Sequence, residues 1–300
     1  MRRRAFTVAE LLVATAVAGV ATALMTATIV RQQRFYSAAG EILSTRSQLR
    51  DAADILASDL RGASVAMFGL PVMTDTAVEL LTVIATSVAC APPLGGVVGL
   101  PPARLVAGHT LTSILVQPDT GDLALIREAS LTVPDSGTWE SFRIAAFASR
   151  SLATTCPSSS GFTTPGDEFS GATGYQLTLT LASSPAIQKG APIYFLRRAR
   201  YSYYRSSDGE RYLGYRRCSA SAPFTCAAIQ PVSGPYSGMT FRYYDSSGAQ
   251  VTTAAESFRV ARVDVVLTGS SASAIALTGD ARTVWHDSVV VTVSPRNRMR

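Results

Sequence analysis

The sequence predicts an α+β protein in which a long N-terminal helix packs on an antiparallel β-sheet and carries an enlarged β-rich head. Three observations support this fold class. An apolar run fills most of the first 30 residues, a helical spacing of apolar residues continues to about residue 61, and short strand-like runs separated by Gly, Pro and Ser follow. Charged residues make up only 16% of the 300 residues, a composition that argues against a disordered chain.

The N-terminal apolar run is long enough to cross a membrane. Between Arg4 and Arg31 the only charged residue is Glu10, and about 20 apolar residues suffice for a membrane helix. Three arginines precede the run, so the positive-inside rule places the N-terminus in the cytoplasm and the rest of the chain beyond the membrane. A secretory signal ending near Ala23 or a plain signal anchor would share these features. Neither explains a carboxylate within the run, which is costly in lipid unless it is paired.

The residues around this carboxylate resemble a processing signal. Residues 5–13, Ala-Phe-Thr-Val-Ala-Glu-Leu-Leu-Val, are similar to the class III signal of type IV pilin-like proteins, whose usual form is Gly followed by Phe-Thr-Leu-Ile-Glu-Leu-Leu-Val. The resemblance implies that a prepilin peptidase removes residues 1–5 as a leader, by a cut between Ala5 and Phe6. It also implies N-methylation of the new Phe6 amine. The apolar helix then stays in the mature protein, with Glu10 as its fifth residue.

A physical role for Glu10 follows from this processing. In a filament the helices bundle away from water, and the carboxylate of Glu10 can meet the positive Phe6 amine of a neighbouring subunit. Such a buried pair selects the register of neighbours more than it adds strength, because either charge alone is strongly unfavourable. Ala5 replaces the usual glycine before the cut, and Ala27 stands where major pilins often carry proline. The second departure is more typical of a minor pilin or a pseudopilin.

The predicted N-terminal helix covers residues 6–61, with a membrane or filament-core segment at 6–30 and an amphipathic stalk at 31–61. Apolar residues in the stalk recur at spacings of three and four, which favours packing of one helix face on a sheet. A coiled coil is the alternative, but the charge pattern that it needs is not clear. Gly62 is the expected end of the helix. The apolar stripe consists of Phe35, Ala39, Ile42, Leu49, Ala53, Leu56 and Leu60.

Residues 62–300 are predicted to form the β-rich head. The strongest signal is a hairpin between strands at 193–205 and 210–217, because Asp208-Gly209 supplies the positive φ angle of a tight turn. Loops are expected at 92–102 and 154–174. Runs rich in β-branched and aromatic residues predict further strands at 78–86, 111–117, 123–133, 139–148 and 175–182.

The last hundred residues extend the resemblance. Residues 239–248 and 258–267 are similar to the C-terminal half of PilW-type minor pilins and J-type pseudopilins, in which a strand ending in aromatic-Asp-x-x-Gly precedes Ile-x-x-Val-x-Val-x-Leu. The residues 293–297 also resemble the ends of PilW-type chains. The resemblance implies a structural minor pilin that assembles into, primes or caps a type IV pilus. The close alternative is a J-type pseudopilin at the tip of a type II secretion pseudopilus.

The resemblance also implies partners and a location. The expected partners are other minor and major pilins or pseudopilins, the prepilin peptidase and the bacterial inner membrane, with a periplasmic head before assembly. A different class of protein, a signal-anchored exported enzyme or binding module, is the lower-ranked alternative. The sequence contains no G-x-S-x-G, P-loop, H-E-x-x-H or dinucleotide-binding motif, so we expect no enzyme activity and no cofactor.

Four cysteines follow the apolar run, on the side of the membrane where disulfides form. Cys218 and Cys226 enclose a short loop after a strand and are the favoured pair, which leaves Cys90 with Cys156. A zinc site is the alternative, but no two cysteines have the C-x-x-C spacing and the two histidines are far apart in sequence. We therefore expect disulfides and no metal site. We interpret the acidic segments at 208–210 and 245–248 as turns, and a calcium site at either of them is the less favoured alternative.

One stretch interleaves arginines with tyrosines between residues 197 and 217. Such a pattern can bind single-stranded nucleic acid by charge and stacking. On a strand, however, alternate residues face opposite sides, which divides the arginines and tyrosines between two faces. We favour a sheet surface with no nucleic-acid partner. The alternative contact set is Arg198, Arg200, Tyr203 and Arg205.

Overall fold

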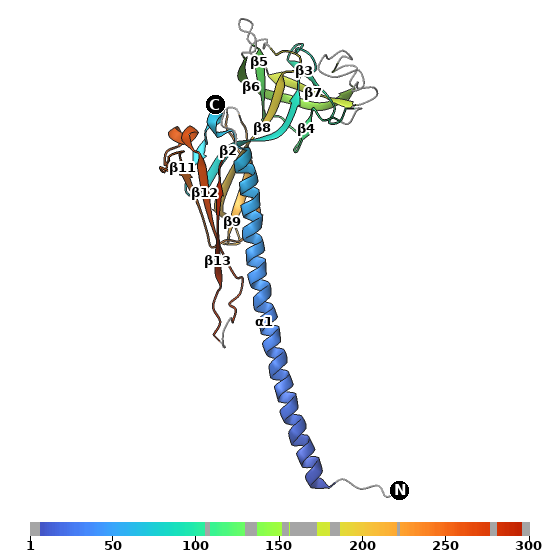
Figure 1. Ribbon diagram of the computed structural model, residues 1–300, viewed down its shortest axis with the longest axis vertical. Helices are drawn as coiled ribbons and strands as arrows, with labels where there is room; N and C mark the ends of the chain where they lie inside the picture. Colours follow the sequence, from blue (N-terminus) through green and yellow to red (C-terminus); the bar gives the residue numbers. More distant parts are fainter. Residues whose placement is uncertain are drawn as a thin grey trace.

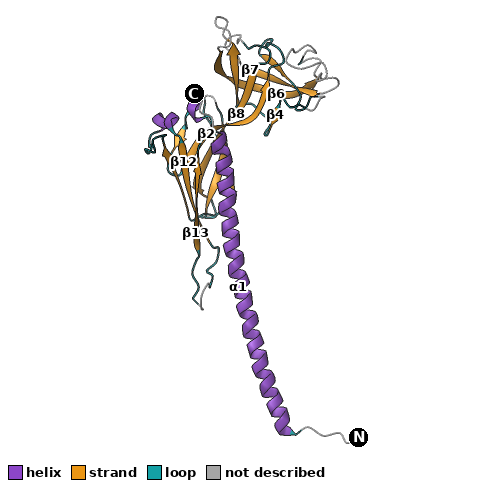
Figure 2. Cartoon of the chain, viewed as in Figure 1, coloured by secondary structure: helices purple, strands orange, loops and turns teal. Residues whose placement is uncertain are grey.

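The chain forms one long helix with two β-rich lobes at its C-terminal end (Figure 1). The computed structural model describes residues 7–105, 109–129, 137–151, 156, 173–180, 187–220, 223–276 and 281–295. We call the lobe beside the helix the proximal lobe and the lobe beyond the end of the helix the distal lobe. Figure 2 shows that both lobes are built from strands, with the long helix as the stem. This arrangement agrees with the predicted α+β class.

The long helix, α1 (Val8–Gly62), contains 55 residues. At about 1.5 Å per residue it is roughly 80 Å long. It begins after the N-cap residue Thr7 and ends at the predicted stop, Gly62, where the next residue, Ala63, turns to an extended conformation. The predicted helix has its ends at residues 6 and 61, close to the observed ones. The proposed leader, residues 1–5, lies outside the described residues.

The larger sheet contains ten antiparallel strands within the described residues. Its main path runs β1 (Val72–Met73), β2 (Ala77–Val88), β8 (Pro192–Arg205), β5 (Leu123–Ala129), β6 (Gly137–Ser151), β7 (Thr173–Thr180) and β3 (Val97–Leu100). Three further strands pair beside this path: β4 (Ser113–Ile114) on β2, β9 (Arg211–Cys218) on β8, and β10 (Gln230–Ser233) on β9.

Strands β2 and β8 run through both lobes. They pair with each other along most of their lengths, and a register shift lies between Val83 and Ala85. On its other edge β8 pairs with β5 at 193–196 and with β9 at 198–205, so its partner changes at Arg197. The two ends of each strand enter different hydrophobic cores. Val78 and Leu80 belong to the proximal core, whereas Ile84 and Ala85 belong to the distal one.

A second, three-stranded sheet completes the proximal lobe. It is ordered β11 (Gly238–Tyr244), β12 (Arg262–Ser270) and β13 (His286–Val293). Every second residue of β12 is buried, which gives this strand one core face and one outer face. The short helices α2 (Val65–Phe68) and η2 (Ala254–Arg259) lie against each other at the end of α1.

The C-terminal half of α1 packs on the proximal lobe. Leu49, Leu56 and Leu60 are almost fully buried and join a core with strands of both sheets. The predicted stripe is therefore confirmed over this half. The prediction is wrong for Phe35, the first residue of the stripe, because its side chain is 67% exposed. The reason is geometric: the strands of the small sheet reach α1 as far as Thr45, and before that position only the connection between β12 and β13 lies beside the helix within the described residues.

Several strand predictions need correction. The predicted loop at 92–102 contains β3, which pairs with β7 and buries Val98 and Leu100 after a turn at Gly95-Gly96. The predicted strand at 111–117 is reduced to the two residues of β4, because Leu115 is 80% exposed and has no place in the core. The hairpin at Asp208-Gly209 is confirmed, with Gly209 at a φ of +88°. Most of the predicted loop at 154–174 lies outside the described residues.

Candidate functional site

The first part of α1, residues 8–30, packs on no other segment of the described part of the chain. Every residue from 7 to 37 is exposed, and this segment is long and apolar enough to cross a membrane. Exposed apolar area is unfavourable in water by about 25 cal/mol per Å², so this half requires lipid or other helices around it. The chain therefore has an N-terminal helix able to anchor it in a membrane in a single pass.

The polar side chains of this apolar half are satisfied within the helix itself. The hydroxyls of Thr15, Thr22, Thr26 and Thr28 each donate to the carbonyl oxygen one turn earlier, at distances of 2.8 to 3.0 Å. Lipid offers no hydrogen-bond partner to a hydroxyl, so internal bonds of this kind suit a helix in an apolar environment.

Glu10 has a structural role at the start of α1. Its carboxylate accepts hydrogen bonds from the backbone N–H of Thr7 at 2.9 Å and from the Thr7 hydroxyl at 3.0 Å. In return, the Thr7 hydroxyl accepts the N–H of Glu10 at 3.3 Å. This reciprocal arrangement is a capping box, which satisfies N–H groups that have no partner within the helix. Ala5 and Phe6 lie outside the described residues, so the cleavage site and the pairing of Glu10 with the Phe6 amine stay predictions.

The other half of α1 is held by polar contacts as well as by its core. The Tyr201 hydroxyl donates to Asp59 at 2.6 Å, and the Tyr236 hydroxyl donates to the carbonyl of Gln48 at 2.8 Å. Burial raises the pKa of Asp59 above the ordinary carboxyl value, and burial also raises the pKa of Tyr201. The hydrogen bond from Tyr201 partly opposes the shift at Asp59. These contacts fix the direction in which the exposed half of α1 leaves the lobe.

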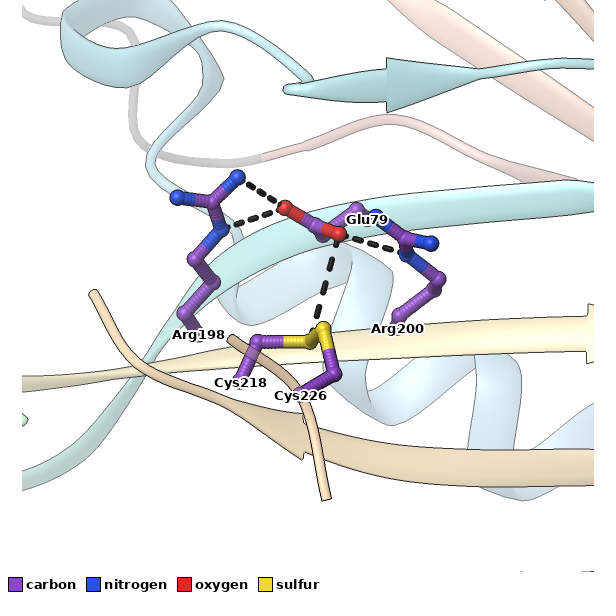
Figure 3. The surroundings of a disulfide bond; sticks show 5 residues. All are labelled: Glu79, Arg198, Arg200, Cys218 and Cys226. Atoms are coloured by element: carbon purple, nitrogen blue, oxygen red, sulfur yellow. Dashed lines mark hydrogen bonds and ion pairs between the residues drawn. A yellow bond between two sulfur atoms is a disulfide. The ribbon is translucent and has the colours of Figure 1, made fainter. Parts of the chain in front are cut away.

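A buried carboxylate lies on the face of the large sheet opposite α1. Val78 and Leu80 face the helix, so the alternation of β2 directs Glu79 to the other face, where its side chain is fully buried. Figure 3 shows Glu79 between Arg198 and Arg200, with the disulfide of Cys218 beside it. Arg200 Nε donates to Glu79 Oε2 at 2.6 Å, and Arg198 forms an ion pair with Oε1. The Cys218 sulfur lies 4.0 Å from Oε2.

A second charged cluster lies where β8 changes partners. Arg197 holds Asp122 through two hydrogen bonds, at 2.7 and 3.1 Å, and Arg217 contacts both Asp119 and Asp122. The hydrogen bond to Asp122 raises the pKa of Arg197, and the hydrogen bond from Arg217 lowers the pKa of Asp119. Asp122 precedes β5 of the distal lobe, whereas Arg217 belongs to β9 of the proximal lobe. The cluster therefore ties the two lobes together.

The four residues of the alternative nucleic-acid set do not form one surface. Arg198 and Arg200 share a face of β8 and are engaged by Glu79. Tyr203 lies on the other face, where its hydroxyl donates to the carbonyl of Tyr236, and Arg205 donates to Gly209 within the hairpin. This division is the one expected for a strand. The division of these side chains between the two faces is thus as the sequence predicts, and nucleic-acid binding is untested.

The four cysteines form two disulfides, Cys218 with Cys226 and Cys90 with Cys156. This is the favoured pairing from the sequence. Within the described residues one group has the compactness of a metal site, namely Glu79 with Cys218 and Cys226. Both of its sulfurs are joined in the disulfide, so the group offers no thiolate, and Glu79 is already paired with arginines. Its chemistry is that of a structural cluster.

Sequence reasoning missed two features that have readable signals. The capping box follows the pattern Thr-x-x-Glu before an apolar run, at residues 7–10. Glu79 is a single acid inside the apolar strand Ala77–Val88, and a carboxylate in such a position needs cationic partners. What the sequence lacks is the identity of those partners, because they come from β8, more than a hundred residues later.

Comparison of the chain with protein-family models gave no match, and searches of curated proteins and of solved structures gave none either.

Proposed function

We propose that this protein is a structural subunit of a pilin-like filament, a minor pilin that assembles into, primes or caps a type IV pilus. The observation that carries the proposal is the division of α1 into two halves. One half is fixed to an antiparallel sheet, whereas the other is apolar and fully exposed, with one acidic residue three positions from its N-cap. A subunit of this shape can store its apolar half in lipid and then bury it among the helices of its neighbours.

The charge of Glu10 supports this proposal more directly than the apolar surface does. An apolar anchor gains only a helix cap from the carboxylate in its first turn, and that carboxylate is costly to bury without a cation. Removal of residues 1–5 would create a positive amine at Phe6, and the resemblance of residues 5–13 to a class III signal is the argument for that cut. The amine of one subunit would then pair with Glu10 of the next. The mature head would lie in the periplasm before assembly.

The capping box makes a sharp test of this pairing possible. Glu10→Gln keeps an oxygen that can accept the Thr7 N–H, but it removes the negative charge. Thr7→Val removes the hydroxyl of the cap and keeps the charge. Cells that carry each variant as the sole copy are assayed for export and for filament assembly, with Glu10→Ala as the reference that loses both features.

We expect Glu10→Gln to be exported and to fail in assembly, like Glu10→Ala. We expect Thr7→Val to assemble close to the wild-type level, because loss of a cap costs only about 1 kcal/mol, whereas an unpaired buried charge costs about 3 to 5 kcal/mol. Normal assembly by Glu10→Gln, combined with failure of Thr7→Val, would show that Glu10 serves the helix cap alone and would contradict the proposal.

A further inference from the structure

The connection between β12 and β13 descends along α1 toward its apolar half. Figure 1 shows this connection below β13, beside the helix. Its described parts are residues 271–276 and 281–285, which we call the arm. The arm is an extension of the β12–β13 ladder: Ser271 N donates to the Trp285 carbonyl at 2.8 Å, and Ile275 and Thr283 exchange two backbone hydrogen bonds at 2.9 and 3.0 Å. The arm is therefore a built hairpin.

Three contacts fix the upper end of the arm against α1. Glu41 accepts the backbone N–H of Ala272 at 2.9 Å. Arg46 forms an ion pair with Asp287 at 2.9 Å and lies over the ring of Trp285, 5.4 Å from its centre. These contacts come from successive turns of the helix, so they hold the hairpin parallel to α1 and set how far it descends.

A cavity of about 280 Å³ lies between the lower part of the arm and the helix. Two arginines line it from opposite sides, Arg34 from α1 and Arg282 from the arm. Gln33, Ser37 and Ser273 add polar groups, and no acidic residue is among its described lining residues. Glu41, two turns above Arg34, is already used to hold Ala272. The one acid in the sequence of residues 271–285, Asp280, lies outside the described residues.

Arg31 adds a third cation below the cavity. It lies three residues before Arg34 and seven before Ala38, both of which line the cavity, so all three share one face of the helix. Its side chain is exposed. Guanidinium groups suit phosphate oxygens, because they offer several N–H donors in a planar fork. A guanidinium has five such donors, so Arg34 can contact a phosphate oxygen and keep another partner.

The position of the cavity along the helix indicates the source of the phosphate. The apolar segment Val8–Val30 is about 34 Å long at 1.5 Å per residue, which matches a hydrocarbon core of about 30 Å. Arg34 is four residues beyond Val30, or about 6 Å along the axis. The headgroup layer of a bilayer begins at the end of the apolar segment and is about 5 to 8 Å thick on each side. The two arginines of the cavity therefore lie at the level of lipid phosphates.

We propose that this cavity binds the headgroup of an anionic phospholipid in the outer leaflet of the membrane that holds the apolar segment. Arg282 and Arg34 contact the phosphate, and Arg31 adds attraction from below. The bound lipid joins the arm to the stem before assembly and sets the height of the head above the membrane. The inference rests on the membrane-anchored state of the proposed function, but it needs neither cleavage at Phe6 nor a filament.

The test uses the full-length chain in detergent and measures lipid adducts by native mass spectrometry. Phosphatidylglycerol and phosphatidylcholine with the same acyl chains are titrated separately. The variants are Arg282→Gln and Arg31→Gln, and the matched control is Arg104→Gln, an exposed arginine at a position remote in sequence from both α1 and the arm. Circular dichroism of each variant checks that the head is folded.

We expect one phosphatidylglycerol to bind with at least fivefold preference over phosphatidylcholine. We expect Arg282→Gln to lower the affinity for phosphatidylglycerol about fivefold, the effect of one cation near an anionic lipid surface, and Arg104→Gln to leave it unchanged. Equal binding of the two lipids, or unchanged binding by folded Arg282→Gln, would overturn the inference. Displacement of the lipid by soluble glycerol phosphate at equal concentration would show that the cavity binds a free phosphate compound and would refute a lipid occupant.

Failure of this inference can be distinguished from failure of the proposed function. Selective binding of phosphatidylglycerol by a chain that is never cut before Phe6 would leave this inference standing and refute the filament subunit. A processed chain without lipid preference would refute this inference alone.

Discussion

Replacement of Glu79 by glutamine tests whether the charged cluster on the outer face of the large sheet holds the proximal lobe together. Glutamine has the same shape as glutamate, so the packing around the side chain is kept. The substitution removes the negative charge that Arg198 and Arg200 share. Two guanidinium groups are then left close together beside the disulfide of Cys218, without a carboxylate.

The expected cost follows from the exposure of the three side chains. Breaking a buried ion pair costs about 3 to 5 kcal/mol, whereas an exposed pair is worth less than about 1 kcal/mol. The side chain of Glu79 is fully buried, that of Arg198 is 12% exposed and that of Arg200 is 31% exposed. We therefore expect a loss near the lower end of the buried range, about 3 kcal/mol. For a domain of this size that corresponds to a fall of about 6 to 12 °C in Tm.

The assay is thermal unfolding of the full chain in detergent, followed by near-ultraviolet circular dichroism. The control is Glu140→Gln, which removes the same charge from an exposed strand position. Arg198→Gln should destabilise the chain more than Arg200→Gln, because the side chain of Arg198 is the more buried of the two. A Tm for Glu79→Gln within 1 °C of that of Glu140→Gln would refute the assignment of a stabilising role to Glu79.

Three further predictions concern the disulfides, the contact between sheet and helix, and a half-buried acid. Replacing Cys90 and Cys156 by serine should lower the free energy of unfolding by about 4 kcal/mol, and replacing Cys218 and Cys226 by about 2.5 kcal/mol. The first loss is larger because the first bridge spans 66 residues and the second spans 8. Denaturant unfolding should show this order, and equal losses would contradict it. Gly269→Ala should lower the free energy of unfolding by about 1 to 3 kcal/mol, since the added Cβ would lie 2.8 Å from Thr45 Cγ2. Thr45→Ser removes that methyl group and should restore most of the lost stability. Failure of this rescue would argue against the clash. Burial raises the pKa of Asp59, so the folded chain keeps the carboxyl proton of Asp59 to a higher pH than the unfolded chain does. The contribution of Asp59 to stability is therefore greatest below its ordinary pKa and falls as the pH rises to the raised pKa. Asp59→Asn should therefore match the wild type at low pH and exceed it at neutral pH, and parallel Tm curves from pH 3 to 7 would contradict this sign.

The sequence predicted the parts of the fold that depend on local pattern. The spacing of apolar residues located α1 to within two residues at each end, and Asp208-Gly209 located the hairpin of β8 and β9. Strand β3 was missed because four residues after a glycine pair carry too little pattern. It is a strand only because β7 pairs with it. Phe35 was wrongly given to the core because helical spacing shows a stripe but not where the partner sheet ends.

The candidate site divides in the same way. The apolar half of α1 and Glu10 could be found from sequence, because a charge in an apolar run is visible without any contact. The Glu79 cluster and the cavity beside Arg34 could not. Each depends on side chains from strands or hairpins that are remote in sequence, with Arg198 meeting Glu79 and Arg282 meeting the stem of α1. Long-range pairing of this kind is set by sheet topology.

The most direct test of the account is the mass of the mature N-terminus, measured on protein purified from membranes of the cells that make it. We predict a chain that begins at Phe6 with a methylated amine and keeps the whole of α1. A chain that still begins at Met1, or one cut near Ala23, would contradict the account, because Glu10 would then have no new amine to meet or would be absent from the mature protein.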